Sequence, residues 1–309
     1  MGGERHTFRF VVDAAHHGLR IDTFLASRLR NHAPARLQRL TAAGLVTVDD
    51  GPCTPFRRVA AGEEVVVRLA EPSQPFYPPT SCEIDVLYDD PWLIAVNKPA
   101  GMIVHPAGPV GDGTLANVVQ AILDRQTRLP GLLRPGIVHR LDRETSGVVL
   151  VAKDYVSHAG LTQQFERSSV SKSYLALVAG RIVENANRID LPIGRQRGSL
   201  LMSAENDAVE PRSATTSFRV IERLRSATLV DVRPVTGRKH QIRVHFAAIG
   251  HAVLGDAGYG FGPNRSGTTR HALHATAIAF RHPVTNAPLR ITAPVPDDLW
   301  HTLATPEAR

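Results

Sequence analysis

Apolar residues recur first with the helical period and then with the strand period over the first seventy residues of the chain. Four of them fall on one face of a predicted helix: Ile21, Phe24, Leu25 and Leu29. Pro34 is suited to open a second short helix, and Gly44 is suited to end it. Apolar runs at 45–48 and 63–69 predict two strands, and the sequence Asp-Asp-Gly at 49–51 predicts a turn after the first of them.

From residue 82 onward, short apolar runs that are typical of strands outnumber helical patterns. The predicted strands are 84–88, 92–98, 146–153, 174–180, 215–224, 227–235, 271–280 and 289–294. The predicted helices are 114–125 with Thr114 as N-cap, 156–167, and 237–250. Because strands and helices do not alternate regularly, we expect the α+β class, with a mainly antiparallel or mixed sheet, flanking helices and a small N-terminal α/β module.

The pattern also divides the chain into three parts. Residues 1–70 form the small module, and residues 82–309 form the larger domain. Between them, residues 71–81 contain four prolines, which predicts an extended linker.

Composition places the chain among ordinary globular proteins, with 43% hydrophobic and 21% charged residues over 309 positions. We find no apolar run long enough to cross a bilayer, and the N-terminus MGGERHTFRF lacks the apolar core of a signal peptide. The two cysteines, Cys53 and Cys82, are too few for a disulfide framework or a cysteine zinc site. These features predict a cytoplasmic protein.

The net charge of +7 favours a polyanionic partner, although many soluble proteins are mildly basic. Almost all basic residues are arginines, which can reflect genomic base composition alone. The four lysines of the chain are Lys98, Lys153, Lys172 and Lys239. They fall in segments that we therefore examined for chemistry.

The first such segment, GIVHRLDRETSGVVLVAK, places a polar cluster between two apolar runs. A cluster in this position is typical of a site built on a rigid scaffold. Asp142 follows the apolar Leu141 and is expected at the end of a strand. Its carboxylate could be a nucleophile, a base, or a turn residue paired with an arginine.

The second segment, TGRKHQIRVHFAAIG, combines a chain break at Gly237 with a predicted helix that ends at Gly250. Arg238 and Lys239 lie at the N-terminal end of this helix, where backbone N–H groups favour a phosphate or a carboxylate. A solvated amphipathic helix is the simpler interpretation of the same charge pattern.

Four segments, taken in order, resemble the RluA family of pseudouridine synthases over roughly residues 82–293. They are DDPWLIAVNKPAGMIVHP, HRLDRETSG, SKSYLALVAG and TGRKHQIRVHFAAIGHAVLGDAGYG. The resemblance implies an enzyme that breaks the bond between uracil and ribose in RNA, turns the base and rejoins it through carbon. Such an isomerisation implies no metal ion and no other cofactor.

The resemblance also assigns roles to individual residues. Asp142 matches the essential aspartate of the family, and it could act as a nucleophile or as a base on the sugar. Arg243 matches the basic residue that pairs with this aspartate, since a neighbouring cation favours the charged carboxylate. Tyr174 matches a tyrosine that stacks on uracil and could help remove a proton, although it could also be a core tyrosine. Ile242 matches an apolar residue that packs against the base.

Further basic residues are implied to bind RNA. Arg140 matches a residue that fills the space left by the flipped uridine, with a phosphate contact as the alternative. Lys98 is expected to shape the pocket rim or to touch phosphate, and Lys172 to do the same or only to flank its strand. The N-terminal part resembles the RNA-binding module first named for ribosomal protein S-four, so Arg36 and Arg39 on its second helix are expected to contact RNA.

That second resemblance is partial. Ala35-Arg36 stands where Ser-Arg is commoner, and Asp49-Asp50-Gly51 replaces the usual Asn-Gly turn. The two aspartates would locally weaken attraction to phosphate. A small αβ domain without RNA contact is the alternative.

Other functions fit the sequence less well than isomerisation. A non-catalytic RNA-binding ribosome-assembly factor with the same fold should have lost Asp142, Tyr174 or Arg243, and all three are present. A glycoside hydrolase or nucleosidase would need a second carboxylate such as Glu144 on the other side of the sugar. The histidines form no HExxH pattern, so a catalytic metal is not expected. We expect a monomer that acts on large-subunit ribosomal RNA, with transfer RNA as the other possible partner and no contact with membranes.

Overall fold

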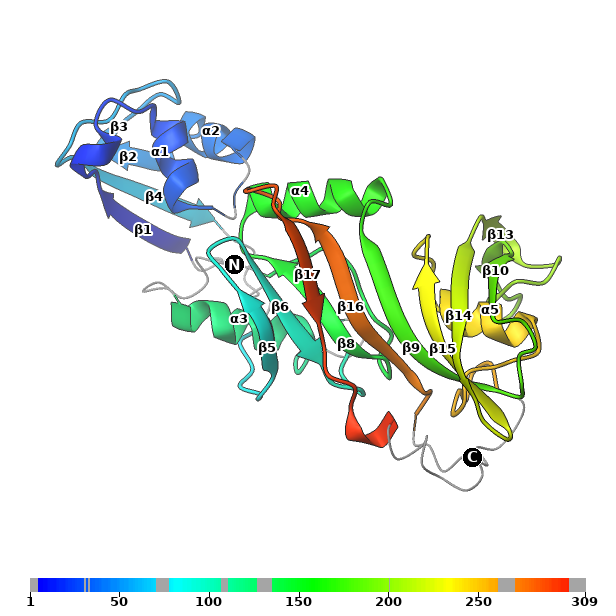
Figure 1. Cartoon of the computed structure of the whole chain (residues 1–309). Helices are drawn as coiled ribbons and strands as arrows, with labels where there is room; N and C mark the ends of the chain where they lie inside the picture. The colour runs from blue at the N-terminus through cyan, green and yellow to red at the C-terminus, as the bar shows by residue number, and fades with distance from the viewer. Residues whose placement is uncertain are drawn as a thin grey trace.

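The computed structural model describes residues 5–30, 32, 34–70, 78–106, 111–126, 135–199, 201–260 and 270–299. The N-terminal part contains a four-stranded sheet of order β1-β4-β2-β3. Its elements are β1 (Arg5–Val11), a 3₁₀ turn (Ala14–His16), α1 (Ile21–Arg28), α2 (Pro34–Ala42), β2 (Val46–Val48), β3 (Gly51–Pro52) and β4 (Glu64–Ala70). Figure 1 shows this small sheet and its two helices (blue) at one end of the molecule.

The predicted elements of this part are confirmed, and one strand was missed. The helical apolar face packs as expected, because Phe24 and Leu25 of α1 are fully buried against the sheet. Asp49 and Asp50 have φ values of 48° and 60°, so both central residues of the β2–β3 turn are left-handed, as a tight hairpin requires. β1 was not predicted, and it pairs antiparallel with β4 along its whole length.

The N-terminal part contacts the rest of the chain through Arg30. Its guanidinium pairs with the Asp154 carboxylate at 2.5 Å and donates to the Pro91 carbonyl at 2.8 Å. The backbone N–H of Tyr155 donates to the Arg30 carbonyl at 2.7 Å. The division of the chain at residues 70 and 82 remains our proposal, since 71–77 of the predicted linker lie outside the described residues.

The rest of the chain is organised by a ten-stranded mixed sheet of order β10-β14-β15-β9-β16-β8-β6-β5, with β17 beside β16 and β7 beside β8. Its strands are β5 (Asp85–Asp89), β6 (Leu93–Lys98), β7 (Gly136–Ile137), β8 (Ser146–Ala152), β9 (Ser171–Ala179), β10 (Ala186–Asp190), β14 (Thr215–Arg223), β15 (Ala227–Pro234), β16 (Leu273–Arg281) and β17 (Pro288–Thr292). The α+β class with a mixed sheet is therefore confirmed. The pairing between β8 and β16 is parallel, whereas the other strand pairs of the described residues are antiparallel.

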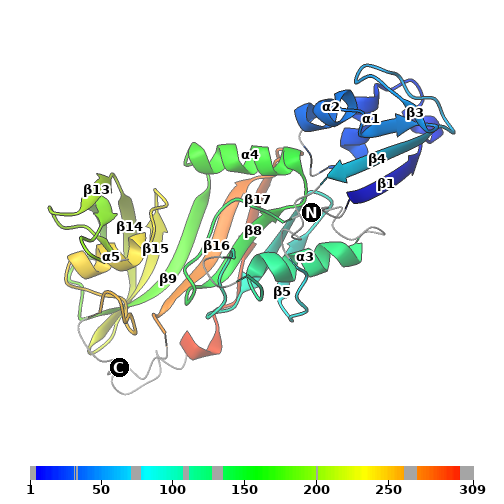
Figure 2. The same cartoon turned by 180° about the vertical axis from the view of Figure 1, so that it is seen from behind.

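Helices cover both faces of the sheet, which explains the continuous apolar runs in β6 and β8. Residues that alternate along β8 point to opposite sides: Val149 and Val151 pack with α3 (Leu115–Gln126), and Val148 and Leu150 pack on the side of α4 (Tyr155–Glu166). α5 (Gln241–Ala248) packs on β14 and β15 at the other end of the sheet. Figure 2 shows α3, α4 and α5 from behind.

Several details depart from the expected elements, and β7 and β10 are among the strands that were not predicted. The helix predicted for 237–250 begins only at Gln241, because His240 adopts the left-handed conformation with φ 56°. A short sheet of order β12-β11-β13 beside α5 was not predicted; its strands are β11 (Ile193–Arg195), β12 (Met202–Ser203) and β13 (Val209–Arg212). Among the described residues, none of the helices combines the length and apolar character that crossing a membrane requires.

Gly147 allows the parallel strands β8 and β16 to approach each other directly after the polar segment around Asp142. Gly147 pairs with Ala275 and has φ 118°. A Cβ atom at this position would lie 2.2 Å from the Ala275 carbonyl oxygen, which is backbone and cannot rotate away. Only glycine therefore permits this register.

We predict that Gly147→Ala lowers the free energy of unfolding by about 2–5 kcal/mol, because it adds backbone strain to a steric clash. Gly111→Ala is the matched control, since nothing lies within 4 Å of a Cβ atom built there. Urea denaturation of the two variants measures the difference. Equal stability of the variants would contradict the close approach of the two strands.

Candidate active site

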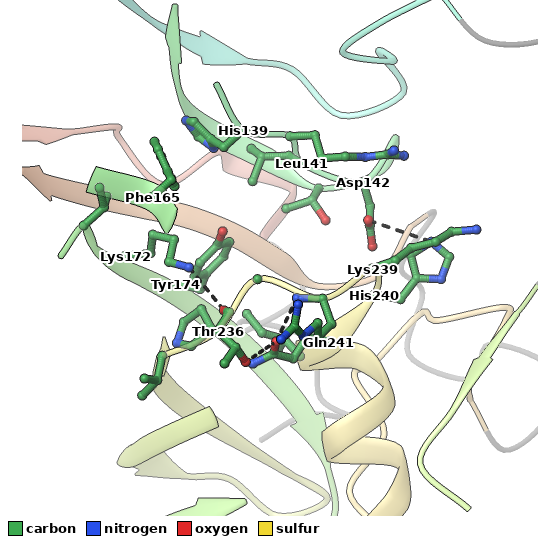
Figure 3. Close-up of a pocket in the computed structure, with 18 of the residues that line it drawn as sticks. His139, Leu141, Asp142, Phe165, Lys172, Tyr174, Thr236, Lys239, His240 and Gln241 are labelled. Carbon is green, nitrogen blue, oxygen red and sulfur yellow. Dashed lines mark hydrogen bonds and ion pairs between the residues drawn. The ribbon is translucent and has the colours of Figure 1, made fainter. Parts of the chain in front are cut away.

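A pocket of about 490 Å³ opens beside the large sheet. It is lined by the segment before β8, by β9, by the loop that joins β15 to α5, by the end of α4 and the residues after it, and by the start of β16. Figure 3 shows Asp142 facing the loop between β15 and α5, with Tyr174 and Lys172 on β9. Site residues predicted from three separate sequence segments thus lie in one cavity.

Asp142 lies in a turn between β7 and β8, in which the backbone N–H of Thr145 donates to the Asp142 carbonyl at 3.1 Å. The expectation that Asp142 ends a strand is wrong, because β7 ends at Ile137 and β8 begins only at Ser146. The preceding residue, Leu141, is buried in the apolar cluster beneath α3. This side chain fixes the turn to the core while Asp142 points into the pocket.

Lys98 holds this turn from behind and does not lie at the rim of the pocket. Its side chain is fully buried, and its ammonium group donates to the carbonyls of Pro99, Met102 and Arg143 at 2.8, 2.9 and 3.0 Å. The expected contact between Lys98 and RNA phosphate is therefore wrong. Three carbonyl acceptors use all three N–H bonds of the ammonium group, so Lys98 positions the backbone beside Asp142.

Two residues that precede β16 hold the other half of the turn. The buried Arg270 donates to the Glu144 carbonyl at 3.0 Å. The Thr145 hydroxyl lies 2.7 Å from Nε2 of His271. Burial lowers the pKa of His271 to about 4, so its ring is neutral near pH 7 and can share this hydrogen bond. Contacts from Lys98, Arg270 and His271 thus hold the turn at Arg143, Glu144 and Thr145.

Arg243 of α5 joins two carboxylates. Its Nη1 donates to Oδ2 of Asp142 at 2.9 Å, and its Nε and Nη2 donate to the two oxygens of Asp256 at 2.7 and 2.8 Å. Asp256 also accepts from the backbone N–H groups of Gly258 and Tyr259. The ion pair expected between Arg243 and Asp142 is present, and Asp256 orients the guanidinium from the other side.

The electrostatics of this triad favour its charged form. Burial opposes the charge on Arg243, but its hydrogen bonds and attraction to Asp256 and Asp142 outweigh this effect and raise its pKa. Burial likewise opposes the charge on Asp256, and the contacts with Arg243 outweigh it and lower the pKa of the carboxyl. The Asp256 side chain is 0% exposed, whereas that of Asp142 is 18% exposed. Asp142 is thus the carboxylate of this pair that a ligand can reach.

Tyr174 on β9 and Ile242 on α5 supply apolar surface to the same pocket. Burial raises the pKa of Tyr174, and the negative charge of Asp142 raises it further. Its hydroxyl therefore stays protonated near neutral pH, and the ring offers a flat surface near Asp142. Ile242 is 6% exposed and belongs to the core cluster that includes Phe246.

The loop between β15 and α5 is shaped by Gln241. The side-chain oxygen of Gln241 accepts from the Thr236 hydroxyl at 2.7 Å and from the backbone N–H of Arg238 at 2.9 Å. Lys172 of β9 donates to the Thr236 carbonyl at 3.2 Å. Burial lowers the pKa of Lys172. Lys172 therefore both lines the pocket and ties its strand to this loop.

The pocket carries an excess of positive charge. Its lining includes five basic side chains against the two carboxylates Asp142 and Glu166: Arg140, Lys172, Arg238, Lys239 and Arg243. Arg140 is exposed at the pocket, two residues before Asp142. Such a lining attracts an anionic ligand while one carboxylate faces it. Within the described ranges, we find no group of three or more metal-ligating side chains.

Two predicted RNA-binding residues lie elsewhere. Arg36 and Arg39 are on α2 of the N-terminal part and are not among the residues that line the pocket. Two other residues next to Asp142 were given no role from the sequence, namely Asp256 and His240. Asp256 could have been noticed as an unassigned carboxylate within the GDAGYG part of the fourth segment.

Comparison with known proteins identifies relatives over most of the chain. Residues 92–248 match the family model described as RNA pseudouridylate synthase. A protein of Bacillus subtilis named as an uncharacterized RNA pseudouridine synthase is 36% identical, over 91% of both chains. Ribosomal large subunit pseudouridine synthase D of Xanthomonas campestris is also 36% identical, over 95% of this chain and 91% of the relative.

Solved structures give the same result for the fold. Human RNA pseudouridylate synthase domain containing 1 is 29% identical and superposes with a TM-score of 0.58, over 69% of this chain and 84% of the human chain. Human RNA pseudouridylate synthase domain containing 4 is 25% identical with the same TM-score, over 71% and 91%.

We predict that Asp256→Asn lowers the free energy of unfolding by about 3–5 kcal/mol, because it removes one partner of a buried ion pair. Asp142→Asn should cost less than about 1 kcal/mol, since Asp256 still neutralises Arg243 and the Asp142 side chain is partly solvated. Urea denaturation of both variants tests this difference. A larger loss in Asp142→Asn would mean that Asp142 serves the fold.

Proposed function

This chain belongs to the RNA pseudouridylate synthase family, and on that basis we propose that it converts uridine to pseudouridine in large-subunit ribosomal RNA with Asp142 as the catalytic carboxylate. The observation that carries the proposal is the position of Asp142, which is held by Arg243 in a basic pocket beside the ring of Tyr174. The names of relatives in Xanthomonas campestris and Pseudomonas aeruginosa, both ribosomal large subunit pseudouridine synthase D, support the choice of RNA.

The reaction needs a group that acts on the sugar while the base is detached. A carboxylate can attack the anomeric carbon or remove a proton beside it, and it stabilises positive charge that develops on the sugar. Arg243 binds one oxygen of Asp142, Oδ2, and the other oxygen, Oδ1, remains available on the side of His240. We propose that Asp256 keeps Arg243 in this orientation, so that Asp142 is presented in one geometry.

The detached base needs a surface that keeps it in the pocket. The ring of Tyr174 and the side chain of Ile242 offer apolar contact at the pocket wall, and stacking on an aromatic ring suits any orientation of uracil. With its proton in place, the Tyr174 hydroxyl serves as a hydrogen-bond donor. Removal of the C5 proton by this residue remains a prediction from the family resemblance.

A uridine in folded RNA must leave its stack to reach Asp142, which costs a few kcal/mol. Arg140 is exposed at the pocket and carries a planar guanidinium that can stack in the vacated place. We propose this role for Arg140, and a phosphate contact for Lys172, whose ammonium faces the pocket from β9.

The geometry disfavours the hydrolase alternative. A glycosidase needs two carboxylates on either side of the sugar. Glu144 is not among the residues that line the pocket, and its carboxylate lies 3.5 Å from Arg143. The second carboxylate that does line the pocket is Glu166, at the C-terminal end of α4.

We predict that the purified chain converts defined uridines of unmodified large-subunit ribosomal RNA without a change in mass and without an added cofactor. Asp142→Asn should lower the rate at least about a thousandfold. Glu144→Gln is the matched control and should stay within about threefold of the wild type, as expected for a residue outside the pocket. Chemical mapping of pseudouridine combined with mass spectrometry measures both. Release of uracil, or normal activity in Asp142→Asn, would exclude the proposed chemistry.

We further propose that the N-terminal module binds RNA through α2. Replacing Arg36 and Arg39 together by Ala should weaken RNA binding and reduce the slope of log K against log salt by about 0.7–0.9 for each lost phosphate contact. Arg9→Ala is the control, because Arg9 on β1 is paired with Glu64 at 2.8 Å. Equal slopes for all three proteins would mean that α2 does not contact phosphate.

A further inference from the structure

His240 is a polar residue of the pocket that the proposed chemistry leaves without a role. Its Nε2 lies 3.8 Å from Oδ1 of Asp142, the oxygen that Arg243 does not bind. This separation is too long for a direct hydrogen bond. Figure 3 shows the imidazole of His240 turned toward Asp142, with a dashed line between them. Both residues line the pocket.

The surroundings of Tyr259 determine which nitrogen of His240 carries the proton. The backbone N–H of Met202 donates to the Tyr259 hydroxyl at 2.9 Å, so this oxygen already accepts one hydrogen bond. The same hydroxyl lies 2.7 Å from Nδ1 of His240 and can donate its own proton there. A neutral His240 then carries its ring proton on Nε2, which faces Asp142.

Other charges near the ring support a neutral imidazole. Burial lowers the pKa of His240, attraction to Asp142 opposes this effect, and repulsion from Arg243 and Lys239 adds to it. The pKa lies below its ordinary value, so the ring is uncharged near pH 7. His240 is therefore a donor at Nε2 and an acceptor at Nδ1.

The backbone of His240 adopts the left-handed conformation, which His enters more often than most residues with a Cβ atom. Its φ of 56° and ψ of 19° are left-handed, which is uncommon for residues that carry a Cβ atom. Such conformations cluster at functional sites, where the surrounding structure maintains them. The contacts of Gln241 with Thr236 and Arg238 fix the loop that runs directly up to His240.

The reaction determines which substrate atom can enter the gap. Whether Asp142 attacks C1′ or takes a proton at C2′, its carboxylate works beside the 2′-oxygen of the target ribose. An oxygen placed about 2.8 Å from both His240 Nε2 and Asp142 Oδ1 fits a separation of 3.8 Å between them. That oxygen would accept from His240 and donate to Asp142, as a hydroxyl can.

We propose that His240 donates its Nε2–H to the 2′-hydroxyl of the target ribose, whose own proton is directed to Oδ1 of Asp142. The assignment rests on the proposed function. It makes His240 a substrate-contacting residue that recognises the hydroxyl by which RNA differs from DNA. Tyr259 and the Met202 backbone are positioning groups that hold the required tautomer.

The test is a double-mutant cycle on the full chain. The RNA is a ribosomal fragment in which the wild type forms pseudouridine, prepared with ribose or with 2′-deoxyribose at the target uridine. For the wild type, removal of the 2′-hydroxyl should weaken binding at least about tenfold, because the bond from His240 and the charge-assisted bond to Asp142 are both lost. For His240→Asn, this penalty should be at least about threefold smaller than in the wild type.

The choice of variant separates recognition from folding. Asn tolerates the left-handed backbone and can still accept from Tyr259, but it is too short to place a donor at the position of Nε2. His240→Gln, whose amide can reach that position, should recover part of the penalty. If His240→Asn does not fold, Tyr259→Phe replaces it, and its penalty should be smaller than that of the wild type because the tautomer is no longer held.

The outcomes distinguish a failure of the His240 role from a failure of the proposed isomerase function. An equal 2′-hydroxyl penalty in the wild type and in the variant would overturn the role of His240 while the isomerase activity of the wild type stands. If the wild type forms no pseudouridine in the ribose RNA, the proposed function fails and the role of His240 fails with it.

Discussion

The pocket depends on one shared cation, the guanidinium of Arg243. One edge of the guanidinium is bound by the buried Asp256, and the remaining Nη1 binds Asp142. A single buried carboxylate opposite Arg243 would neutralise the guanidinium, but no carboxylate would then face the pocket. With two carboxylates, the buried one fixes the orientation of the cation and the exposed one is held ready for a ligand. Under the proposed function, Asp256 serves stability and Asp142 serves reactivity, although the two side chains are chemically identical.

The large sheet supplies the rigidity that this arrangement requires. Tyr174 is on β9, and the turn that carries Asp142 leads into β8. β16 lies between these two strands and is paired with both. Because apolar residues cover both faces of β8, neither strand can slide without exposing buried side chains. The distance between the ring of Tyr174 and the carboxylate of Asp142 is therefore set by backbone pairing and by the tethered turn.

Much of this fold could be predicted from the sequence because long apolar runs have a clear period. The strands that were missed are short or lie at an edge, as with β11 and β12, where burial imposes little pattern. Asp142 and Arg243 were predictable together only because family motifs linked segments about a hundred residues apart. The role of Lys98 was not predictable, because a lysine in a polar motif gives no sign of whether its ammonium faces solvent or carbonyl groups. His240 was uninformative for the same reason, since its proton position depends on Tyr259.

The tethers of the turn around Asp142 have a consequence for the timing of synthesis. The turn is held by Arg270 and His271, and Arg270 is itself paired with Asp298. These contacts join residues that are made far apart in time on the ribosome. β8 and the turn emerge long before β16 and the residues that hold the turn. The Asp142 carboxylate can therefore reach the geometry it has in the folded protein only after Asp298 has been made, and a nascent chain that stops before Arg270 would lack both tethers of the turn.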